Sequence, residues 1–103
     1  LYRPNRNMYV SKREAIRRII KDVVGIDPYK DIKFKGEEYV KARQLYFYFI
    51  RKYEKISLYT TGQLLGKRHP TVIHAEKCVE KYREIEPFYR YNFELIDRKI
   101  KSL

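Results

Sequence analysis

The sequence predicts an all-α protein, a compact bundle of about five helices that contains a helix-turn-helix. Apolar residues recur at the helical period of about 3.6 residues along most of the chain. Proline and glycine divide the chain into segments with recognisable helix starts and ends, and no segment shows the strict alternation of a half-buried strand. Because 103 residues suffice for one hydrophobic core, we expect residues 1–103 to form a single domain.

The first predicted helix runs from Ser11 to Gly25. Ser11 followed by Glu14 is the capping-box spacing, in which two side chains satisfy backbone N–H groups of the first turn. Gly25 suits the left-handed conformation that commonly ends a helix. Between these signals the segment has an apolar face and a basic face, formed by Ile16, Ile19, Ile20 and Val23 and by Lys12, Arg13, Arg17 and Lys21 respectively.

The second predicted helix covers about residues 39–53 and follows a loop. Asp27-Pro28 opens that loop, which continues through residues 33–36. Every residue from 45 to 50 is apolar or aromatic. A helix that is apolar nearly all round belongs in the centre of a bundle, and we expect it there.

A helix-turn-helix candidate occupies about residues 57–84. Ser57 can cap a short third helix that ends at Leu65, and Gly66 suits the left-handed position just past that end. Pro70 suits the first position of the next helix, because proline has a fixed φ and no N–H. Spacing alone is a limited argument, since any helical bundle contains short helices joined by turns.

The fourth predicted helix, from Pro70 to about Glu84, has an inward and an outward face. At about 100° per residue, its inward side is apolar and carries Val72, Ala75, Val79 and Tyr82. The outward side at its start has His69 at the cap, followed by Pro70, Ile73, His74 and Lys77. A fifth helix begins at Pro87 and runs to the C-terminus.

The turn before the fourth helix is the most informative segment for function. Lys67, Arg68 and His69 place three potential donors at a helix N-terminus, where the backbone N–H groups are themselves unpaired. Such an arrangement favours a phosphate or the edge of a base. Because recognition helices use their N-terminal residues on base edges, we expect readout from this turn and from the outward face.

The charge balance points to a polyanionic partner. The chain has 24 Lys and Arg against 13 Asp and Glu, a formal net charge of +11. A basic balance also suits ribosomal proteins, membrane-surface binders and merely soluble domains, so it does not identify the polyanion.

Composition also bounds the class of protein. The hydrophobic content of 44% excludes a disordered basic tail, and no stretch is long and apolar enough for a signal core or a membrane span. We therefore expect a soluble, intracellular protein that does not enter a membrane. The single cysteine, Cys78, cannot form an internal disulfide, which fits a reducing compartment. The first residue is Leu1 rather than Met, which suggests a trimmed chain or a piece of something longer.

The segment from Gly66 to Ala75, which reads Gly-Lys-Arg-His-Pro-Thr-Val-Ile-His-Ala, resembles a known signature. The C-terminal duplex-binding domain of the bacterial replication initiator DnaA has Gly-Arg-Asp-His-Thr-Thr-Val-Leu-His-Ala at that place. Arg43-Gln44 opening the second helix, Ser57-Leu58 opening the third and Gly62 within the third also match that family. The similarity extends over roughly residues 15–100, which is nearly the whole chain.

The resemblance implies a helix-turn-helix in the major groove and a basic loop that reaches the adjacent minor groove. It implies a base contact by His69, a phosphate contact by Thr71, and backbone contacts by Arg43, by Gln44 and by the main-chain N–H groups of Leu58 and Tyr59. With the residues around the turn included, the predicted base contacts are Arg68, His69, Pro70 and Ile73. The predicted DNA-backbone contacts are Arg43, Gln44, Leu58, Tyr59, Lys67, Thr71 and Lys77, and the predicted minor-groove loop contains Lys33 and Lys35.

Several residues depart from the family pattern. Arg68 stands where the family has an aspartate that can accept from a cytosine amine, and Pro70 replaces a threonine that touches bases. The preferred DNA sequence is therefore expected to differ. The basic loop corresponds to residues 33–38, where Glu37 and Glu38 weaken any reach into the minor groove, and Cys78 replaces a basic residue.

Alternative roles remain for individual residues. Arg43 can also be a solvated charge near a helix start, and Ile73 can pack against the third helix instead of touching a thymine methyl. His74 is interpreted as a structural histidine that orients the turn. Most of the 11 tyrosines fall at core spacing, which leaves Tyr29 and Tyr59 as open positions for base stacking.

Catalysis finds little support in the sequence. The segment from Gly62 to Arg68 superficially resembles a phosphate-binding loop, but its spacing is one residue short, no Ser or Thr follows the lysine, and no strand precedes it. His74 and Cys78 stand one helical turn apart, but His69 is the only other soft ligand for a zinc site. We therefore expect no enzyme activity, no metal and no cofactor.

The sequence thus predicts a protein that binds double-stranded DNA with sequence preference. The resemblance implies a cytoplasmic, nucleoid-associated protein that acts in replication initiation or its regulation. Two rivals come from other classes. One is a module that binds RNA or single strands through basic faces and exposed tyrosines. The other is a protein-interaction module of a replication complex, and other replication or regulatory proteins are further candidate partners. The sequence does not specify the oligomeric state.

Overall fold

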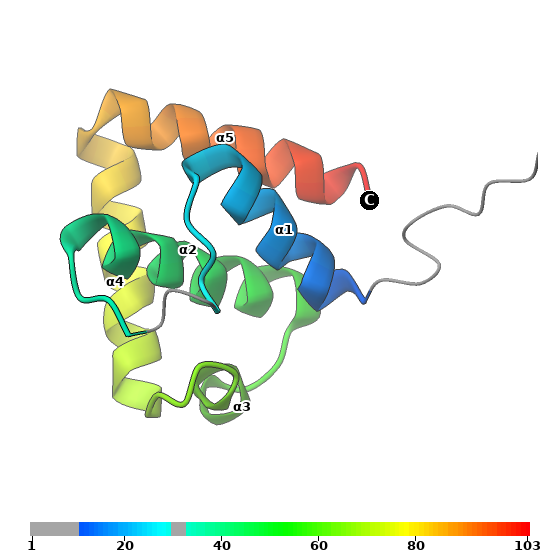
Figure 1. The fold of residues 1–103 in the computed structure, drawn as a ribbon, viewed down its shortest axis with the longest axis vertical. Helices are drawn as coiled ribbons and strands as arrows, with labels where there is room; N and C mark the ends of the chain where they lie inside the picture. Colours follow the sequence, from blue (N-terminus) through cyan, green and yellow to red (C-terminus); the bar gives the residue numbers. More distant parts are fainter. Residues whose placement is uncertain (1–10, 30–32) are drawn as a thin grey trace, which may run out of the picture.

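Five helices make up the part of the chain that the structure, a computed structural model, describes, namely residues 11–29 and 33–103 (Figure 1). The helices are α1 (Lys12–Val24), α2 (Glu37–Glu54), α3 (Leu58–Gln63), α4 (His69–Ile85) and α5 (Pro87–Lys101). No strand occurs within these ranges, and the predicted all-α bundle is confirmed.

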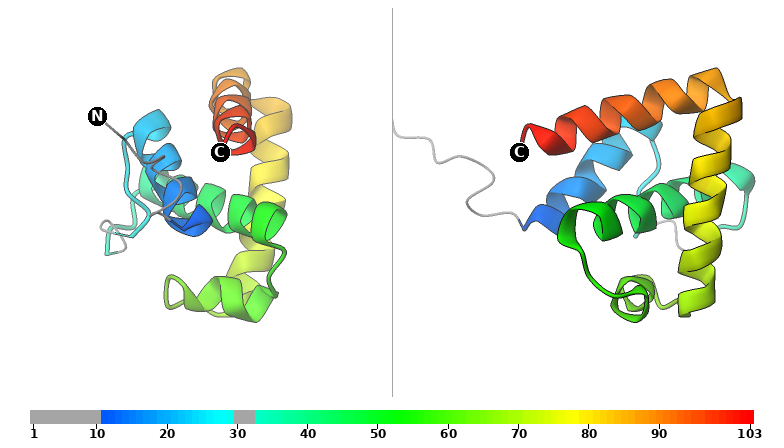
Figure 2. Two further views of the ribbon diagram at one scale, coloured as in Figure 1. Left: turned by 90° about the vertical axis from the view of Figure 1, so that its right-hand side faces the viewer. Right: turned by 180° about the vertical axis from the view of Figure 1, so that it is seen from behind.

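Helix α2 lies in the middle of the bundle, as its apolar sequence predicts. It packs against α1, α3 and α4, while α5 packs against α1 and α4 (Figure 2). Its Tyr46, Phe47, Phe49 and Ile50 are at most 2% exposed. These side chains need a partner on almost every side of the helix, and the surrounding helices supply it.

Local signals account for both ends of α1. The Ser11 Oγ accepts from the backbone N–H of Glu14 at 3.0 Å, and Gly25 ends the helix in the left-handed region with φ of 80°. The Glu14 carboxylate accepts from Arg17 at 2.6 Å and from Arg18 at 3.2 Å. Glu14 therefore neutralises part of the basic face that the sequence predicts for this helix.

The ends of α2 and α3 differ slightly from their predicted positions. Helix α2 begins at Glu37, two residues before the predicted start, because Gly36 serves as its N-cap. Glu37 and Glu38 therefore lie in a helical first turn and not in the loop, a correction to the sequence interpretation. Acidic side chains at this position interact favourably with the helix dipole. Helix α3 ends at Gln63, two residues before the predicted end.

A tight corner joins α4 to α5. Glu86 alone separates the two helices, and Pro87 occupies the first turn of α5 as predicted. Arg90 donates to the carbonyl oxygens of Arg83 at 2.8 Å and Glu84 at 2.6 Å. These bonds satisfy carbonyls that the end of α4 would otherwise leave open, and they hold the corner seen in Figure 2.

The inward face of α4 is as predicted. Val72, Ala75 and Val79 are at most 1% exposed, and Tyr82 packs against the same hydrophobic cluster while half-buried. This buried face fixes the rotation of α4 about its own axis. The opposite side of the helix start is consequently turned outward.

Candidate nucleic-acid interface

Helix α3, a left-handed turn and α4 form the helix-turn-helix. Ser57 caps α3, because its Oγ accepts from the backbone N–H of Thr60 at 3.0 Å. Gly66 has φ of 66°, the left-handed conformation that the sequence predicts for it. The predicted helix-turn-helix segment is therefore present, and its two helices pack against each other (Figure 1).

Gly62 allows the turn to lie directly on α3. The backbone N–H of Lys67 donates to the Gly62 carbonyl at 2.8 Å. A Cβ at position 62 would lie 2.5 Å from the carbonyl oxygen of Lys67, closer than real Cβ contacts allow. Only glycine fits this approach between two backbone segments. The match of Gly62 to the family pattern thus has a steric cause, which the sequence alone did not reveal.

The start of α4 differs from the prediction. Arg68, in an extended conformation, is the N-cap residue, His69 is the first helical residue and Pro70 the second. His69 was predicted to be the cap and Pro70 the first residue, so both assignments are corrected by one position. Proline is tolerated at the second position for the same reason as at the first, since N–H groups of the first turn have no intrahelical acceptor.

No side chain caps the beginning of α4. The Arg68 side chain makes no capping hydrogen bond, and the first turn of this helix holds no acidic residue. The partial positive charge at the helix N-terminus therefore has no acidic residue within its own first turn to balance it. An anion placed here would meet backbone N–H groups together with basic side chains.

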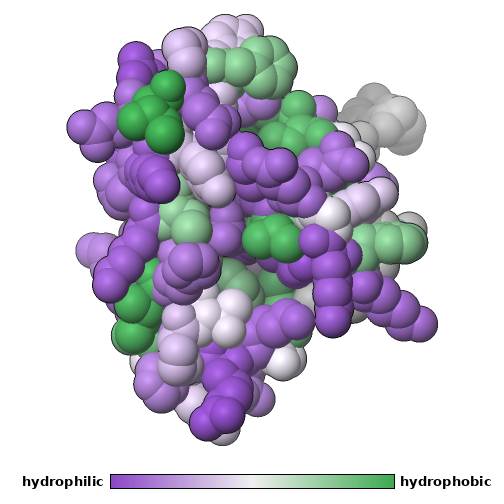
Figure 3. Space-filling view, turned by 90° about the vertical axis from the view of Figure 1, so that its left-hand side faces the viewer, coloured by the Kyte–Doolittle hydropathy of each residue, from purple (hydrophilic) through white to green (hydrophobic). Residues whose placement is uncertain are grey.

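The four residues predicted to contact bases all reach the surface. Arg68, His69 and Pro70 are exposed, and Ile73 retains 37% of its surface. Of the predicted backbone contacts near them, Thr71 and Lys77 are exposed and Lys67 is half-buried. Hydrophilic side chains cover most of the surface on the side that includes α4, and hydrophobic ones show there as separate patches (Figure 3). The structure thus brings six of these residues to the turn and the first turns of α4, while Lys77 lies near the middle of that helix.

Leu58 and Tyr59 occupy the first turn of α3, where backbone N–H groups have no acceptor within the helix. The Leu58 side chain packs against the core, whereas Tyr59 is 67% exposed. The other tyrosine considered for stacking, Tyr29, is half-buried, and its hydroxyl lies 2.6 Å from that of Tyr46. Tyr59 is therefore the better placed of the two for a ligand.

Arg43 and Gln44 lie in the interior of α2 rather than at its opening. Each is only 8% exposed, so the interpretation of Arg43 as a solvated charge is wrong. The buried Oε1 of Gln44 has no hydrogen-bond partner within the described residues. A phosphate would reach these side chains only at their small exposed part, and their role as backbone contacts stays a prediction.

The predicted minor-groove loop is only partly described. Lys33 and Lys35 are exposed, while positions 30–32 of the same loop lie outside the described residues. Phe34 between the two lysines packs against Tyr39, with ring centroids 5.0 Å apart. Glu37 forms an ion pair with Lys41 at 3.3 Å in the first turns of α2.

His74 and Cys78 contact each other along α4. The Nε2 of His74 lies 3.3 Å from the Cys78 Sγ, one turn further on. This contact of His74 is with its own helix, and its role in orienting the turn stays a prediction. Within the described ranges, no three His, Cys, Asp or Glu side chains group as a metal ion would need.

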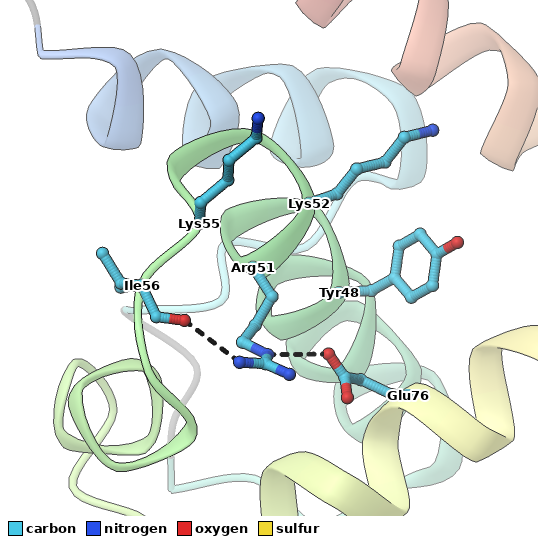
Figure 4. A pocket seen from close by; sticks show the side chains of 6 residues that line it. All are labelled: Tyr48, Arg51, Lys52, Lys55, Ile56 and Glu76. Carbon is cyan, nitrogen blue, oxygen red and sulfur yellow. Dashed lines mark hydrogen bonds and ion pairs between the residues drawn. The ribbon is translucent and has the colours of Figure 1, made fainter.

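Sequence reasoning missed a basic residue beneath the helix-turn-helix. Arg51 of α2 lines a hollow of about 420 Å³ together with Tyr48, Lys52, Lys55, Ile56 and Glu76 (Figure 4). It bonds to both α4 and the segment before α3. The sequence contains no signal for this arrangement, because Arg51, Ile56 and Glu76 come from separate parts of the chain.

The comparisons with known proteins concern the same segment. The family described as bacterial dnaA protein helix-turn-helix matches residues 13–79, well over half of the chain. This chain belongs to that family. In this member of the DnaA family, the helix-turn-helix consists of α3, the turn and α4 as described above.

Curated relatives of this DnaA helix-turn-helix carry the name chromosomal replication initiator protein DnaA. The Porphyromonas gingivalis protein is 30% identical over 91 residues, which are 87% of this chain and 19% of the relative. The Flavobacterium psychrophilum protein is 30% identical over 95 residues, 86% of this chain and 20% of the relative. The Kosmotoga olearia protein is 32% identical over 73 residues, which are 69% of this chain and 16% of the relative.

The chain spans about a fifth of the length of the curated relatives, as the 19% and 20% shares show. No solved structure matches it. Across the described part of this DnaA-family chain, none of the helices combines the length and the apolar character that crossing a bilayer requires.

Proposed function

We propose that residues 1–103 form one domain that binds double-stranded DNA with sequence preference through α3, the turn and α4. Membership of the DnaA helix-turn-helix family supports this function, and the relatives are named as replication initiators. We accordingly propose a role in replication initiation or its regulation, at the nucleoid in the cytoplasm. The domain binds without catalysing a reaction, and other replication or regulatory proteins are its further partners.

The observation that carries the proposal is the start of α4. Its N-terminus lacks a side-chain cap and a first-turn acid, exposed Arg68 and His69 lie at it, and exposed Lys77 lies further along the helix. These residues belong to a chain with a net charge of +11. Backbone N–H groups and basic side chains then neutralise phosphates while the helix start meets base edges in the major groove.

The residues divide into two roles. Arg68, His69, Pro70 and Ile73 would contact bases, because they lie at the exposed start of α4. Lys67, Thr71, Lys77 and the first-turn N–H groups of Leu58 and Tyr59 would hold the DNA backbone. Arg43 and Gln44 contribute through their remaining exposed part, and Lys33 and Lys35 reach toward the adjacent minor groove.

Selection of binding sites from a random duplex library tests the proposal. Variants are then titrated on the selected duplex and on a scrambled one. His69→Ala should cost about 1–3 kcal/mol on the selected duplex and less on the scrambled one, since a base contact carries sequence information. Lys77→Ala should weaken both by a similar factor.

Lys81→Ala is the matched control, because Lys81 is an exposed lysine of α4 far from the helix start. It should change binding to either duplex only slightly. If the library yields no enriched sequence, the sequence preference is wrong. If single strands compete better than duplex, the single-strand module takes its place.

A further inference from the structure

Arg51 lies where three parts of the chain meet. Its Nε donates to Oε2 of Glu76 in α4 at 3.0 Å, and its Nη1 donates to the backbone carbonyl of Ile56, just before α3, at 3.1 Å (Figure 4). The side chains of Arg51 and Glu76 are 31% and 29% exposed. One guanidinium group of α2 therefore bonds both to α4 and to the segment that leads into α3, at a site that is partly shielded from water.

We propose that Arg51 is a positioning residue for DNA binding, which fixes the angle between α2 and the helix-turn-helix. This proposal rests on the proposed duplex binding. A guanidinium is planar and rigid, so its Nε and Nη1 donors have a fixed relation to each other. The Glu76 carboxylate and the Ile56 carbonyl are held in the same relation. The Nε donor holds α4 through Glu76 and so sets the angle of α4 to α2. The Nη1 donor holds the Ile56 carbonyl and so sets where α3 begins relative to α2.

The neighbouring residues of the hollow do not make this double connection. Lys52 pairs with Asp97 of α5 at 3.1 Å, and thus ties α2 to the opposite side of the bundle. The Tyr48 hydroxyl donates to Glu80 at 3.0 Å, which links α2 to α4 one turn after Glu76 but does not reach the segment before α3. Among the described residues that line the hollow, Arg51 is therefore the one whose side chain bonds both to α4 and to the segment that leads into α3.

A direct phosphate contact is the rival role for Arg51. It would use the positive charge, whereas positioning uses the bonds to Glu76 and Ile56. The two roles differ in their salt dependence. The slope of log K against log salt is negative, and each lost phosphate contact makes it shallower by about 0.9. They also differ in whether Arg51 and Glu76 act together.

The decisive experiment is a double-mutant cycle of Arg51→Met and Glu76→Met, read as affinity for the selected duplex at several salt concentrations. Arg51→Met should lower this affinity by on the order of tenfold while the salt slope stays that of the wild type. The double variant should bind no worse than Arg51→Met alone, because the second change removes a partner that is already lost. The proposal would be overturned if the affinity losses of the two single variants multiply in the double variant. It would also be overturned if the salt slope of Arg51→Met is shallower than that of the wild type by about 0.9.

Two further variants sharpen the cycle. Lys52→Met removes the same charge from the same hollow without touching α4, so it should leave the ratio of selected to scrambled affinity near that of the wild type. Arg51→Lys keeps the charge but cannot span both acceptors. It should lower affinity for the selected duplex nearly as much as Arg51→Met, and it replaces that variant if Arg51→Met fails to fold. Full activity of Arg51→Lys contradicts positioning.

A measurement without DNA separates this proposal from the function on which it rests. Residual dipolar couplings of backbone amides report the orientation of α4 relative to α2 in the free protein. Arg51→Lys should change or reduce the couplings of α4 relative to those of α2, and Lys52→Met should not. Unchanged couplings contradict the positioning role even if the wild type binds DNA. Absence of duplex binding by the wild type, with altered couplings in Arg51→Lys, contradicts only the proposed function.

Discussion

At the scale of single residues, Arg68 is the sharpest departure from the DnaA pattern. It occupies the N-cap of α4 without making a capping bond, and its side chain is exposed. A guanidinium offers two parallel donors that match O6 and N7 of guanine, whereas an aspartate can only accept, as from the amine of cytosine. The side chain is thus available to a base or to a phosphate.

We predict that Arg68→Asp changes the selected DNA sequence at one base pair. The expected change is a restored preference for cytosine on the strand beneath this residue, an exchange of the strands of a G·C pair. Site selection with the wild type and the variant measures it. The alternative is that Arg68 binds a phosphate, and a uniformly weaker variant that selects the same sequence would establish that role instead.

Asp97 illustrates how one half-buried carboxylate ties α5 to α2. It accepts from Tyr53 and Lys52 of α2, and Lys101 lies 3.2 Å from its other oxygen. Burial alone would raise the pKa of Asp97, but the hydrogen bonds from Tyr53, Lys52 and Lys101 outweigh burial and lower it. A carboxylate with a lowered pKa stabilises the fold above its unfolded-state pKa, and this contribution is lost as the pH falls through the folded-state value.

We predict that Asp97→Asn lowers the free energy of unfolding by about 1 kcal/mol near neutral pH. The difference between wild type and variant should shrink below about pH 4 and disappear once the wild-type carboxyl is protonated. Urea denaturation at a series of pH values measures both effects. Asp22→Asn, at an exposed position of α1, serves as the control. A difference that stays constant down to the acid end would show that the carboxylate charge contributes nothing.

At the scale of elements, the helix-turn-helix depends on backbone contact between α3 and the turn. The Gly62 carbonyl accepts from both Leu65 at 3.1 Å and Lys67 at 2.8 Å. These bonds bring the chain back over α3, which sets where α4 begins. The position of Arg68 and His69 relative to α3 thus depends on a residue that has no side chain.

We predict that Gly62→Ala destabilises the protein by about 1–3 kcal/mol, because the added methyl group must displace backbone and cannot push aside a flexible side chain. Duplex affinity should fall as the turn moves. Thermal unfolding and duplex titration measure the two effects. Gln63→Ala, the exposed next residue of α3, should leave both nearly unchanged. Equal effects of the two changes would contradict the close approach.

Local sequence signals predicted most of the elements. Ser11, Gly25, Ser57, Gly66 and Pro87 all have the capping or turn role that was assigned to them, because such roles depend on a few neighbouring residues. The start of α4 was misplaced by one residue, since proline fits either of the first two helical positions. Short-range chemistry therefore locates helix ends to within one or two residues.

The interior of the candidate site was less predictable. Arg43 and Gln44 sit at helical positions that are polar in sequence, and their burial follows from how α2 is surrounded by three other helices. Arg51 has no sequence signal at all, because Ile56 and Glu76 reach it only after the bundle has formed. The exposed start of α4 was predicted correctly, since it follows from helix periodicity and from Val72, Ala75 and Val79 facing the core.

At the scale of the whole molecule, the acidic side chains are too few to neutralise the basic ones. Glu54 pairs with Arg13 at 2.9 Å, Glu76 with Arg51 at 3.0 Å and Asp97 with Lys52 at 3.1 Å, all between different helices. These ion pairs leave the formal net charge of the whole chain at +11. A molecule with such an excess attracts nucleic acid over a distance that salt shortens.

We predict that duplex affinity falls steeply with salt. If about five to eight phosphates are contacted, the slope of log K against log salt should be near −0.9 for each contact. Titrations at several salt concentrations measure it, and Lys77→Ala should reduce the slope by about one contact. A flat response at measurable affinity would favour the protein-interaction module over DNA binding.

The packing of α1 against α5 has a consequence for synthesis of the protein. Ile16 and Ile20 of α1 share the hydrophobic cluster with Phe93, Ile96 and Ile100 of α5, although three helices separate them in sequence (Figure 1). Helix α1 is synthesised before α5, so α2 can pack against its apolar side early, but the part of that side that α5 covers stays exposed until α5 has emerged. Closing so long a loop costs chain entropy before any contact repays it. Nascent chains that stop within α5 would therefore remain open to chaperones and proteases.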